Sequence, residues 1–403
     1  MPTPTQRLYY HDPYATDFDA TVTSVAARDN CLLVRLDRTA FYPTSGGQPF
    51  DTGRLGTARV VDVFEAEDAD VVHVVEAVDP IEVGDRAHGA VDWQRRFDHM
   101  RQHSGQHVLS AACDRLFGVS TVSFHLGAET STIDIARELT VVEIAAVEDE
   151  ANRIVGENRP VTIRFASAEE ASRLPLRKEP ARQGTLRLIE VESFDLSACG
   201  GTHVSATGAI GLIGVISCER FKGGQRLEFV CGGRVLKRLR TLRDAVAGSI
   251  RLLSVLPDEL PSAIDRLQAD AKDRGRAIVA LQNELARYRA EEMAEAAETT
   301  ARGRLVCRAI DADAKELKTL ASAITARPGF VAVLTSPSAP VLVVIARSPD
   351  VEIRSNDVLS ALTALFGGRG GGKPDLAQGG GLSGPVAEIL AEARRLIGLG
   401  QSL

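Results

Sequence analysis

Two short pairs of metal-binding side chains, almost a hundred residues apart, constrain the fold of this sequence more than any other feature. His103 and His107 are separated by three residues, and so are Cys199 and His203. Histidines at positions i and i+4 project from one face of a helix. Three nitrogens and one sulfur suit zinc, which prefers tetrahedral sites. A fold that uses all four must bring two distant segments together around one metal ion.

The same residue types also fit two arrangements without catalysis. Cys199 would then be a core residue and the histidines surface or N-cap residues, or a zinc ion would only pin the helix to the later loop. Four protein ligands normally make a closed site. The sequence also lacks a His-Glu-x-x-His motif, which would supply a general base. Catalysis would therefore need a ligand that dissociates or a fifth contact to substrate.

Length and composition set the broad class. A chain of 403 residues predicts two or three domains. The net charge of −7 argues against a protein that is basic over its whole surface and coats nucleic acid, but it allows a local basic patch. No apolar run is long enough to cross a bilayer, and residues 1–14 do not resemble a signal peptide. Six scattered cysteines are not a disulfide framework, so we expect a cytoplasmic protein.

Hydrophobic periodicity predicts an α+β protein with four parts. Residues 1–93 alternate in short β runs (21–25, 32–36, 58–64 and 71–75) and should form a small barrel or curled sheet. Residues 94–232 are expected to form an α+β zinc-binding part, with its histidines inside a helix that ends at Gly118. Residues 233–302 are predicted to be a helical connector, and residues 303–403 an α/β unit.

The connector carries a row of apolar residues at alternating three- and four-residue steps. Arg274 interrupts this seam. The seam predicts a helical hairpin, other packing within the chain, or a coil that joins two copies. The seam consists of Ile264, Leu267, Ala271, Ile278, Leu281, Leu285 and Tyr288.

Two further segments carry polar groups on tight turns. The segment Thr39–Gln48 contains Pro43 and two glycines, which predict a turn after a strand. Such a turn either has solvated hydroxyls or forms the polar wall of a pocket. Residues 367–373 are a glycine-rich loop that includes Arg369 and Lys373, with Gln378 shortly after. Backbone N–H groups beside two cations predict an anion cradle, although a flexible linker has the same composition.

A basic stretch follows the second metal-type pair. Such a run is usually a solvated helix face, but it would equally suit contacts to a nucleic-acid backbone. The basic residues are Arg220, Lys222, Arg226, Arg234, Lys237, Arg238, Arg240 and Arg243.

Together these motifs resemble a known family. His103-Ser-Gly-Gln-His107 and Cys199-Gly-Gly-Thr-His203, preceded by Thr39-Ala-Phe-Tyr-Pro-x-x-Gly-Gly-Gln48, resemble the editing domain of alanyl-tRNA synthetase. The glycine run at 367–380 resembles the C-terminal tRNA-binding domain of the same enzymes, which also occurs in DHH phosphoesterases. The sequence enters its β region almost at once, so we expect a freestanding editing protein of the long AlaX type.

The resemblance implies a specific activity. It implies ATP-independent hydrolysis of the ester in tRNA(Ala) mischarged with serine, or with glycine, with Zn²⁺ held at His103, His107, Cys199 and His203. By the same resemblance, Thr39 and Gln48 would shape the amino-acid pocket, and Arg369, Lys373 and Gln378 would contact tRNA. Synthetases commonly carry glutamate where Thr44 stands, so no general base is evident in the turn.

Two other functions compete with this one. The first is a non-catalytic tRNA-binding factor with a structural zinc. The second is a phosphoesterase, suggested only by Asp98-His99, which lacks the rest of a DHH motif. A homodimer through the connector or the C-terminal unit is a further expectation.

Overall fold

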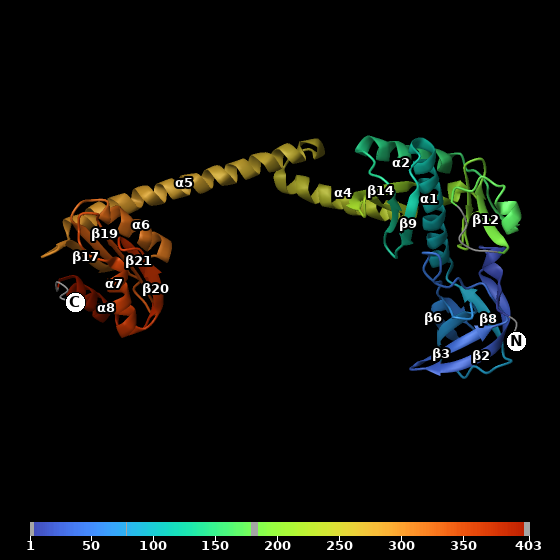
Figure 1. Ribbon diagram of the computed structural model, residues 1–403, viewed down its shortest axis with the longest axis horizontal. Coiled ribbons are helices and arrows are strands. Elements are labelled where there is room, and N and C mark those ends of the chain that lie inside the picture. The colour runs from blue at the N-terminus through green and yellow to red at the C-terminus, as the bar shows by residue number, and fades with distance from the viewer. Residues whose placement is uncertain (1–3, 78, 179–183, 399–403) are drawn as a thin grey trace. The chain divides into compact units, whose positions relative to one another are not determined.

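The computed structural model describes residues 4–77, 79–178 and 184–398 (Figure 1). The chain divides into two compact units, Met1–Ser249 and Ile250–Leu403. Both units mix helices with sheets, which confirms the predicted α+β class. The division into four parts with boundaries at 93, 232 and 302 stays a prediction.

The first unit begins with a closed six-stranded barrel, as the alternating β runs predicted. Its strands are joined in the order β2-β3-β7-β6-β5-β8. Alternate residues such as Val34, Leu36, Val60 and Val75 point inward and are fully buried or nearly so. The strands are β2 (Asp17–Arg28), β3 (Cys31–Leu36), β5 (Gly53–Leu55), β6 (Ala58–Glu65), β7 (Val71–Glu76) and β8 (Arg86–Val91), beside a short pair of β1 (Gln6–Arg7) and β4 (Arg38–Thr39).

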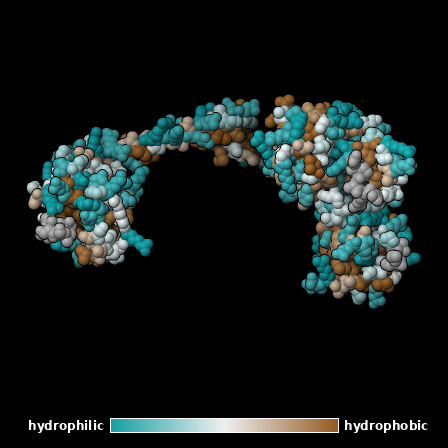
Figure 2. All heavy atoms as spheres, in the orientation of Figure 1, coloured by the Kyte–Doolittle hydropathy of each residue, from teal (hydrophilic) through white to brown (hydrophobic). Residues whose placement is uncertain are grey.

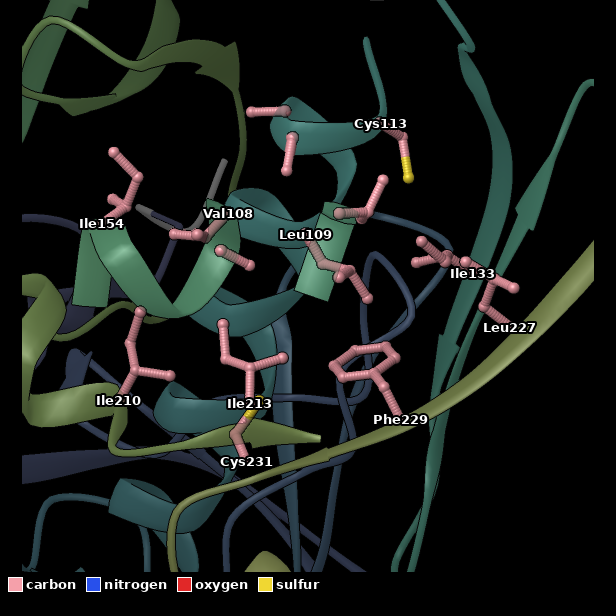
Figure 3. Packing of buried hydrophobic residues seen from close by; sticks show 14 of the residues in the cluster. Val108, Leu109, Cys113, Ile133, Ile154, Ile210, Ile213, Leu227, Phe229 and Cys231 are labelled. Carbon is pink, nitrogen blue, oxygen red and sulfur yellow. The ribbon is translucent and has the colours of Figure 1, made fainter. Parts of the chain in front are cut away.

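Helix α1 (Trp93–Phe117) follows the barrel directly. It begins at Asp92, whose carboxylate accepts from the Arg95 N–H, and ends at Gly118 in the left-handed conformation with φ of 62°. The middle of α1 is buried on all sides, and Figure 3 shows Val108 and Leu109 packed among residues such as Ile154 and Phe229 from other helices and strands. The helix is therefore a central element of the unit and a rigid platform for the side chains it carries.

Two sheets and further helices surround α1. The larger sheet has the order β14-β15-β10-β9 and the smaller one β11-β12-β13, with every pairing antiparallel. Helix α2 starts with a capping box between Thr140 and Glu143. The elements are β9 (Thr121–Leu126), β10 (Ser131–Ile135), α2 (Val141–Gly156), β11 (Val161–Ala166), α3 (Ala168–Ala171), β12 (Leu186–Val191), β13 (Asp195–Ala198), β14 (Ile213–Phe221) and β15 (Gly224–Cys231).

Two long helices follow the larger sheet. They are α4 (Gly233–Leu253) and α5 (Leu260–Glu295), with Pro257 in the turn between them. The predicted apolar seam lies on α5, where Leu267, Leu281 and Tyr288 are more than half exposed. Brown and teal side chains both line this part of the chain in Figure 2. The seam is thus present, but the single chain leaves it open to solvent.

The second unit is a six-stranded mixed sheet with the order β16-β17-β18-β19-β21-β20. Helices α7 and α8 contribute to the core on one face, and α5 and α6 to the core on the other. The elements are β16 (Glu298–Thr300), β17 (Gly303–Ala309), α6 (Ala314–Thr325), β18 (Phe330–Thr335), β19 (Val341–Arg347), α7 (Ser355–Phe366), β20 (Arg369–Gly372), β21 (Leu376–Leu382) and α8 (Val386–Gly398).

The glycine-rich segment was predicted as a loop, and this prediction was wrong. Residues 369–372 and 376–382 are paired antiparallel strands, in which Gly371 faces Gln378. Glycine has a low strand propensity, so a strand is not expected from these residues. Here it is required by close backbone approach, because a Cβ on Gly370 would lie 2.6 Å from the Gln378 carbonyl oxygen and one on Gly372 2.4 Å from that of Leu376.

Two global features bear on the environment of the protein. All six cysteines have free thiols. Among the helices of the described residues, none combines the length and the apolar character that a membrane span requires.

Candidate metal centre

Helix α1 positions the first pair of predicted ligands. His103 and His107 are one turn apart, both are buried, and their ring centroids are 5.4 Å apart. Because the helix is packed on every side, neither ring can swing into solvent. The helical spacing therefore fixes two imidazoles on one face, as the sequence indicated.

The second pair lies on the loop that follows β13. Buried Arg187 holds this loop, because its guanidinium donates to the carbonyl oxygens of Cys199 and Gly201, each at 2.8 Å. Gly201 passes so close to α1 that a Cβ would lie 2.1 Å from the His103 ring. Only glycine fits at this position, and its absence of a side chain lets His203 reach the histidines of α1.

The structure brings all four side chains together. Their ligand atoms lie within 4.8 Å of one another. The Cys199 sulfur is 3.3 Å from Nε2 of His103 and 3.4 Å from Nε2 of His203. This group of four could hold a metal ion.

The orientation of each imidazole fits a metal site. All three rings bond a neighbouring side chain through Nδ1, which leaves Nε2 as the free donor atom. Nδ1 of His103 donates to Gln48 Oε1 at 2.8 Å, and Nδ1 of His107 donates to Asp195 Oδ2 at 3.0 Å. The third partner, at 3.2 Å from Nδ1 of His203, is the hydroxyl of Ser104 on α1. The donor set and its surroundings therefore suit zinc.

Gln48 links the barrel to this centre. The segment before it turns tightly, with Gly46 and Gly47 at positive φ and two hydrogen bonds between Ser45 and Gln48. The buried Gln48 oxygen accepts from His103 and from the Thr202 N–H at 3.1 Å, while its amide donates to the Thr202 hydroxyl at 2.8 Å. All these bonds lie within the protein, so the structure places Gln48 as the group that orients His103.

Asp195 is a site residue that the sequence did not single out. Its carboxylate accepts from His107, from the Arg177 guanidinium at 2.7 Å and from the Ser197 hydroxyl. Burial alone would raise the pKa of Asp195, but the hydrogen bond and charge of His107 and the charge of Arg177 bring the pKa down to about 2. An acidic residue four positions before Cys199 is the one local signal, and it is not distinctive.

The protonation state of the metal-free cluster follows from its contacts. Burial disfavours the Cys199 thiolate, yet the facing imidazoles of His103 and His203 hold the pKa of Cys199 well below its usual value. Burial also disfavours a charged His107, but the bonds to Asp195 and Cys199 raise its pKa to about 9. Burial and the charge of His103 lower the pKa of His203 to about 3. At neutral pH the centre thus carries a thiolate and a proton on His107.

Thr39 ends β4 beside the barrel, and its buried hydroxyl makes two hydrogen bonds. Its oxygen is 2.8 Å from Nε2 of buried His73 and accepts from the Phe41 N–H at 3.1 Å. Nδ1 of His73 donates to the Val34 carbonyl at 3.1 Å, and burial lowers the His73 pKa to about 4. The neutral ring therefore has a bare Nε2, and the Thr39 hydroxyl must donate to it. Toward any ligand, Thr39 can only accept.

The predicted tRNA-contact residues lie on the β20–β21 hairpin of the second unit. Arg369 and Gln378 line a hollow of about 370 Å³ together with bare glycine backbone such as Gly371. Lys373 lies in the turn of the hairpin and is exposed. The hairpin thus presents two polar side chains to one hollow and a cation beside it.

Three protein families match successive parts of the chain. Residues 11–95 match the class II (A) tRNA synthetases, residues 186–228 the threonyl and alanyl tRNA synthetase second additional domain, and residues 302–399 the DHHA1 domain. An alanine–tRNA ligase from Methanoregula boonei is 35% identical over 94% of the chain. This chain is related to the alanyl-tRNA synthetases. The family resemblance inferred from the motifs is therefore confirmed as a relationship to these enzymes.

Other relatives agree. Alanine–tRNA ligases from Pyrococcus abyssi and Natronomonas pharaonis are 32% and 35% identical over 93% and 96% of this chain. The chain spans 42% to 43% of the length of these three relatives. The solved C-Ala domain of the Aquifex aeolicus alanyl-tRNA synthetase is 24% identical, with 26% of this chain and 98% of that chain covered at a TM-score of 0.24.

Proposed function

We propose that this protein hydrolyses the ester of tRNA(Ala) mischarged with serine and so protects translation fidelity. The observation that carries this proposal is the cluster of three imidazoles and one thiolate tied to Gln48 of the barrel turn. The relation to alanyl-tRNA synthetases supports a tRNA-related role. The six free thiols support a reducing cytoplasm as its location.

The proposed cofactor is one Zn²⁺ ion held by His103, His107, Cys199 and His203. When bound, zinc supplies Lewis acidity that can anchor and polarise the ester. An aminoacyl ester is already activated, so the protein contributes mainly placement. Gln48 holds the His103 ring, and Asp195 holds the His107 ring and keeps it a good ligand.

The fixed polarity of Thr39 supports its proposed role in recognising the amino acid. Because its proton is committed to His73, its oxygen can accept from the hydroxyl or ammonium group of a bound serine. Alanine has no hydroxyl to donate. A site built to bond a hydroxyl can discriminate strongly against an analogue without one. We therefore propose that Thr39 selects serine over alanine and that His73 keeps Thr39 in the accepting state.

Purified full-length protein with bound zinc should release serine from Ser-tRNA(Ala) and spare Ala-tRNA(Ala). Cys199→Ala should abolish the release. Cys231→Ala is the matched control, because it removes another buried thiol beside α1 that is not one of the four donors. No turnover by the zinc-loaded protein, or equal loss in both variants, would contradict the proposal.

A non-catalytic tRNA-binding factor with a structural zinc is the second candidate. It is favoured by the four-donor set, because structural zinc sites are usually closed by four protein ligands. Thr39→Val discriminates between the two functions, since Thr39 touches none of the four ligands. A loss of serine release with tRNA affinity retained supports the hydrolase. The absence of any release from Ser-tRNA(Ala), with zinc and tRNA both bound, supports the binding factor.

We also propose that the hairpin of the second unit contacts tRNA through Arg369, Lys373 and Gln378. Its bare glycine backbone and exposed cations suit phosphate groups. Arg369→Ala with Lys373→Ala should weaken tRNA binding and reduce its dependence on salt. Unchanged affinity would contradict this role.

We propose that a second copy of the chain packs against the exposed α5 seam. Leucine side chains such as Leu267, Leu281 and Leu285 are at least half exposed, which is costly for a row of apolar residues. Light scattering at micromolar concentration should give the mass of a dimer, and Leu281→Glu should return it to a monomer. A monomer before the substitution would contradict the proposal.

A further inference from the structure

Helix α4 carries a dense basic face in a chain that is acidic overall. Its 21 residues include six arginines and lysines but one acid, Asp244, whereas the whole chain has a net charge of −7. None of the α4 residues is buried. A local positive field on an acidic protein marks a surface that attracts anions.

Three of these cations are free to act on a partner. Arg234 pairs with Asp98 at 2.6 Å, and Arg243 pairs with its neighbour Asp244. Lys237, Arg238 and Arg240 are exposed and form no ion pair with any acidic group of the described residues. Their charges are therefore not neutralised within the unit.

The free cations share one side of the helix. At 100° per residue, Lys237, Arg238 and Arg240 fall within one half of the helix surface, and the apolar row that includes Leu239 and Val246 lies in the other half. Lys237 and Arg240 are about 4.5 Å apart along the helix axis. This spacing lets neighbouring side chains reach successive phosphates of one backbone.

The first turn of α4 is fixed to the helix that carries the metal-type histidines. Gln102, next to His103, accepts from the Cys231 N–H at 2.8 Å and donates to the Cys231 carbonyl at 3.1 Å. The Arg234–Asp98 pair adds a second link between α4 and α1. The basic face and the candidate metal centre thus belong to one rigid unit.

We propose that Lys237, Arg238 and Arg240 of α4 bind the sugar–phosphate backbone of the RNA whose ester is placed at the metal centre. This inference rests on the proposed function for the identity of the RNA, but its surface is testable by binding alone. We favour an RNA backbone over an anionic membrane because the first turn of α4 is fixed to α1, the helix that carries His103 and His107.

The test uses full-length protein with Lys237→Glu, Arg238→Glu and Arg240→Glu combined. Binding of uncharged tRNA(Ala) is measured from about 50 to 200 mM salt, the range in which phosphate contacts are most visible. The matched control reverses three exposed barrel arginines, Arg28, Arg54 and Arg86, which changes the net charge equally. Circular dichroism and zinc content verify that both variants are folded.

Three lost phosphate contacts should reduce the slope of log affinity against log salt by about 2 to 3 and weaken binding by about 100-fold near 0.1 M salt. With Ser-tRNA(Ala) as substrate, the α4 variant should have a raised KM and an unchanged kcat. The control should bind like the parent protein.

Equal weakening in both variants would overturn the inference, because it would show a general effect of net charge. Unchanged tRNA affinity in the α4 variant would overturn it too, as would loss of binding to phosphatidylserine vesicles in place of tRNA. If the parent protein binds tRNA through α4 but never releases serine, the proposed hydrolase fails while this surface stands.

Discussion

Replacing Asp195 with asparagine should weaken zinc binding while the fold persists. The variant keeps the size of the side chain and an oxygen that can accept from His107, but it removes the negative charge. In the structure the Asp195 carboxylate accepts from Nδ1 of His107 at 3.0 Å and from the Arg177 guanidinium at 2.7 Å. Hydrogen bonds to an ionised acceptor are about twice as strong as neutral ones.

The expected loss is about 10- to 100-fold in zinc affinity, the usual cost of removing the partner of a metal-binding histidine. This corresponds to about 1.4 to 2.7 kcal/mol. The pKa of Asp195, near 2, means that the full charge is present at any pH at which zinc binds. The size of the effect should therefore not change between pH 6 and pH 8.

A chromophoric chelator that competes for zinc measures this affinity directly. Asp134→Asn is the matched control, because Asp134 is also a largely buried carboxylate paired with an arginine, Arg226 at 2.7 Å. Its partners include none of the four donors. Zinc affinity of Asp195→Asn within about twofold of the parent, or an equal loss in Asp134→Asn, would refute the reasoning.

Three further outcomes follow from buried groups of the first unit. His73, with its pKa lowered to about 4, stays neutral while the unfolded chain takes up a proton, so stability should fall by about 3 kcal/mol as pH drops from 6.5 to 4. His73→Asn should reduce this dependence of stability on pH, measured by denaturation followed through the fluorescence of Trp93, the one tryptophan of the chain. An unchanged dependence on pH would contradict the reasoning. Arg96→Met leaves a buried carboxylate unpaired and should cost about 3–5 kcal/mol by the same probe, whereas Arg95→Met should cost far less. Because His107 holds a proton up to a pKa of about 9, zinc binding at pH 7 should release about one proton, seen as a buffer-dependent calorimetric enthalpy; no release would contradict the assigned charge state.

Local patterns in the sequence were sufficient for much of the fold. Helix α1 and its end at Gly118 follow from periodicity and a capping glycine, and both features depend on neighbouring residues alone. The barrel strands likewise show in-and-out alternation. Strands β20 and β21 gave no such signal, because their glycines are selected by backbone contacts across the sheet rather than by strand propensity.

The candidate site divides in the same way. The four donors could be found because each pair is local in sequence. Their partners could not, because the contacts are made by tertiary structure: Asp195 reaches His107 across 88 residues, and Gln48 reaches His103 across 55. His73 could not be identified from the sequence either, because a lone histidine in a β run is usually a core residue. Its contact with Thr39 is made only in the folded structure.

X-ray absorption of the zinc-loaded full-length protein tests the central claim most directly. One zinc per chain should show one sulfur neighbour near about 2.3 Å and three nitrogens near about 2.0 Å, with the sulfur contribution lost in Cys199→Ala. A zinc coordinated by nitrogen and oxygen alone, or a protein that retains no stoichiometric zinc, would contradict the account.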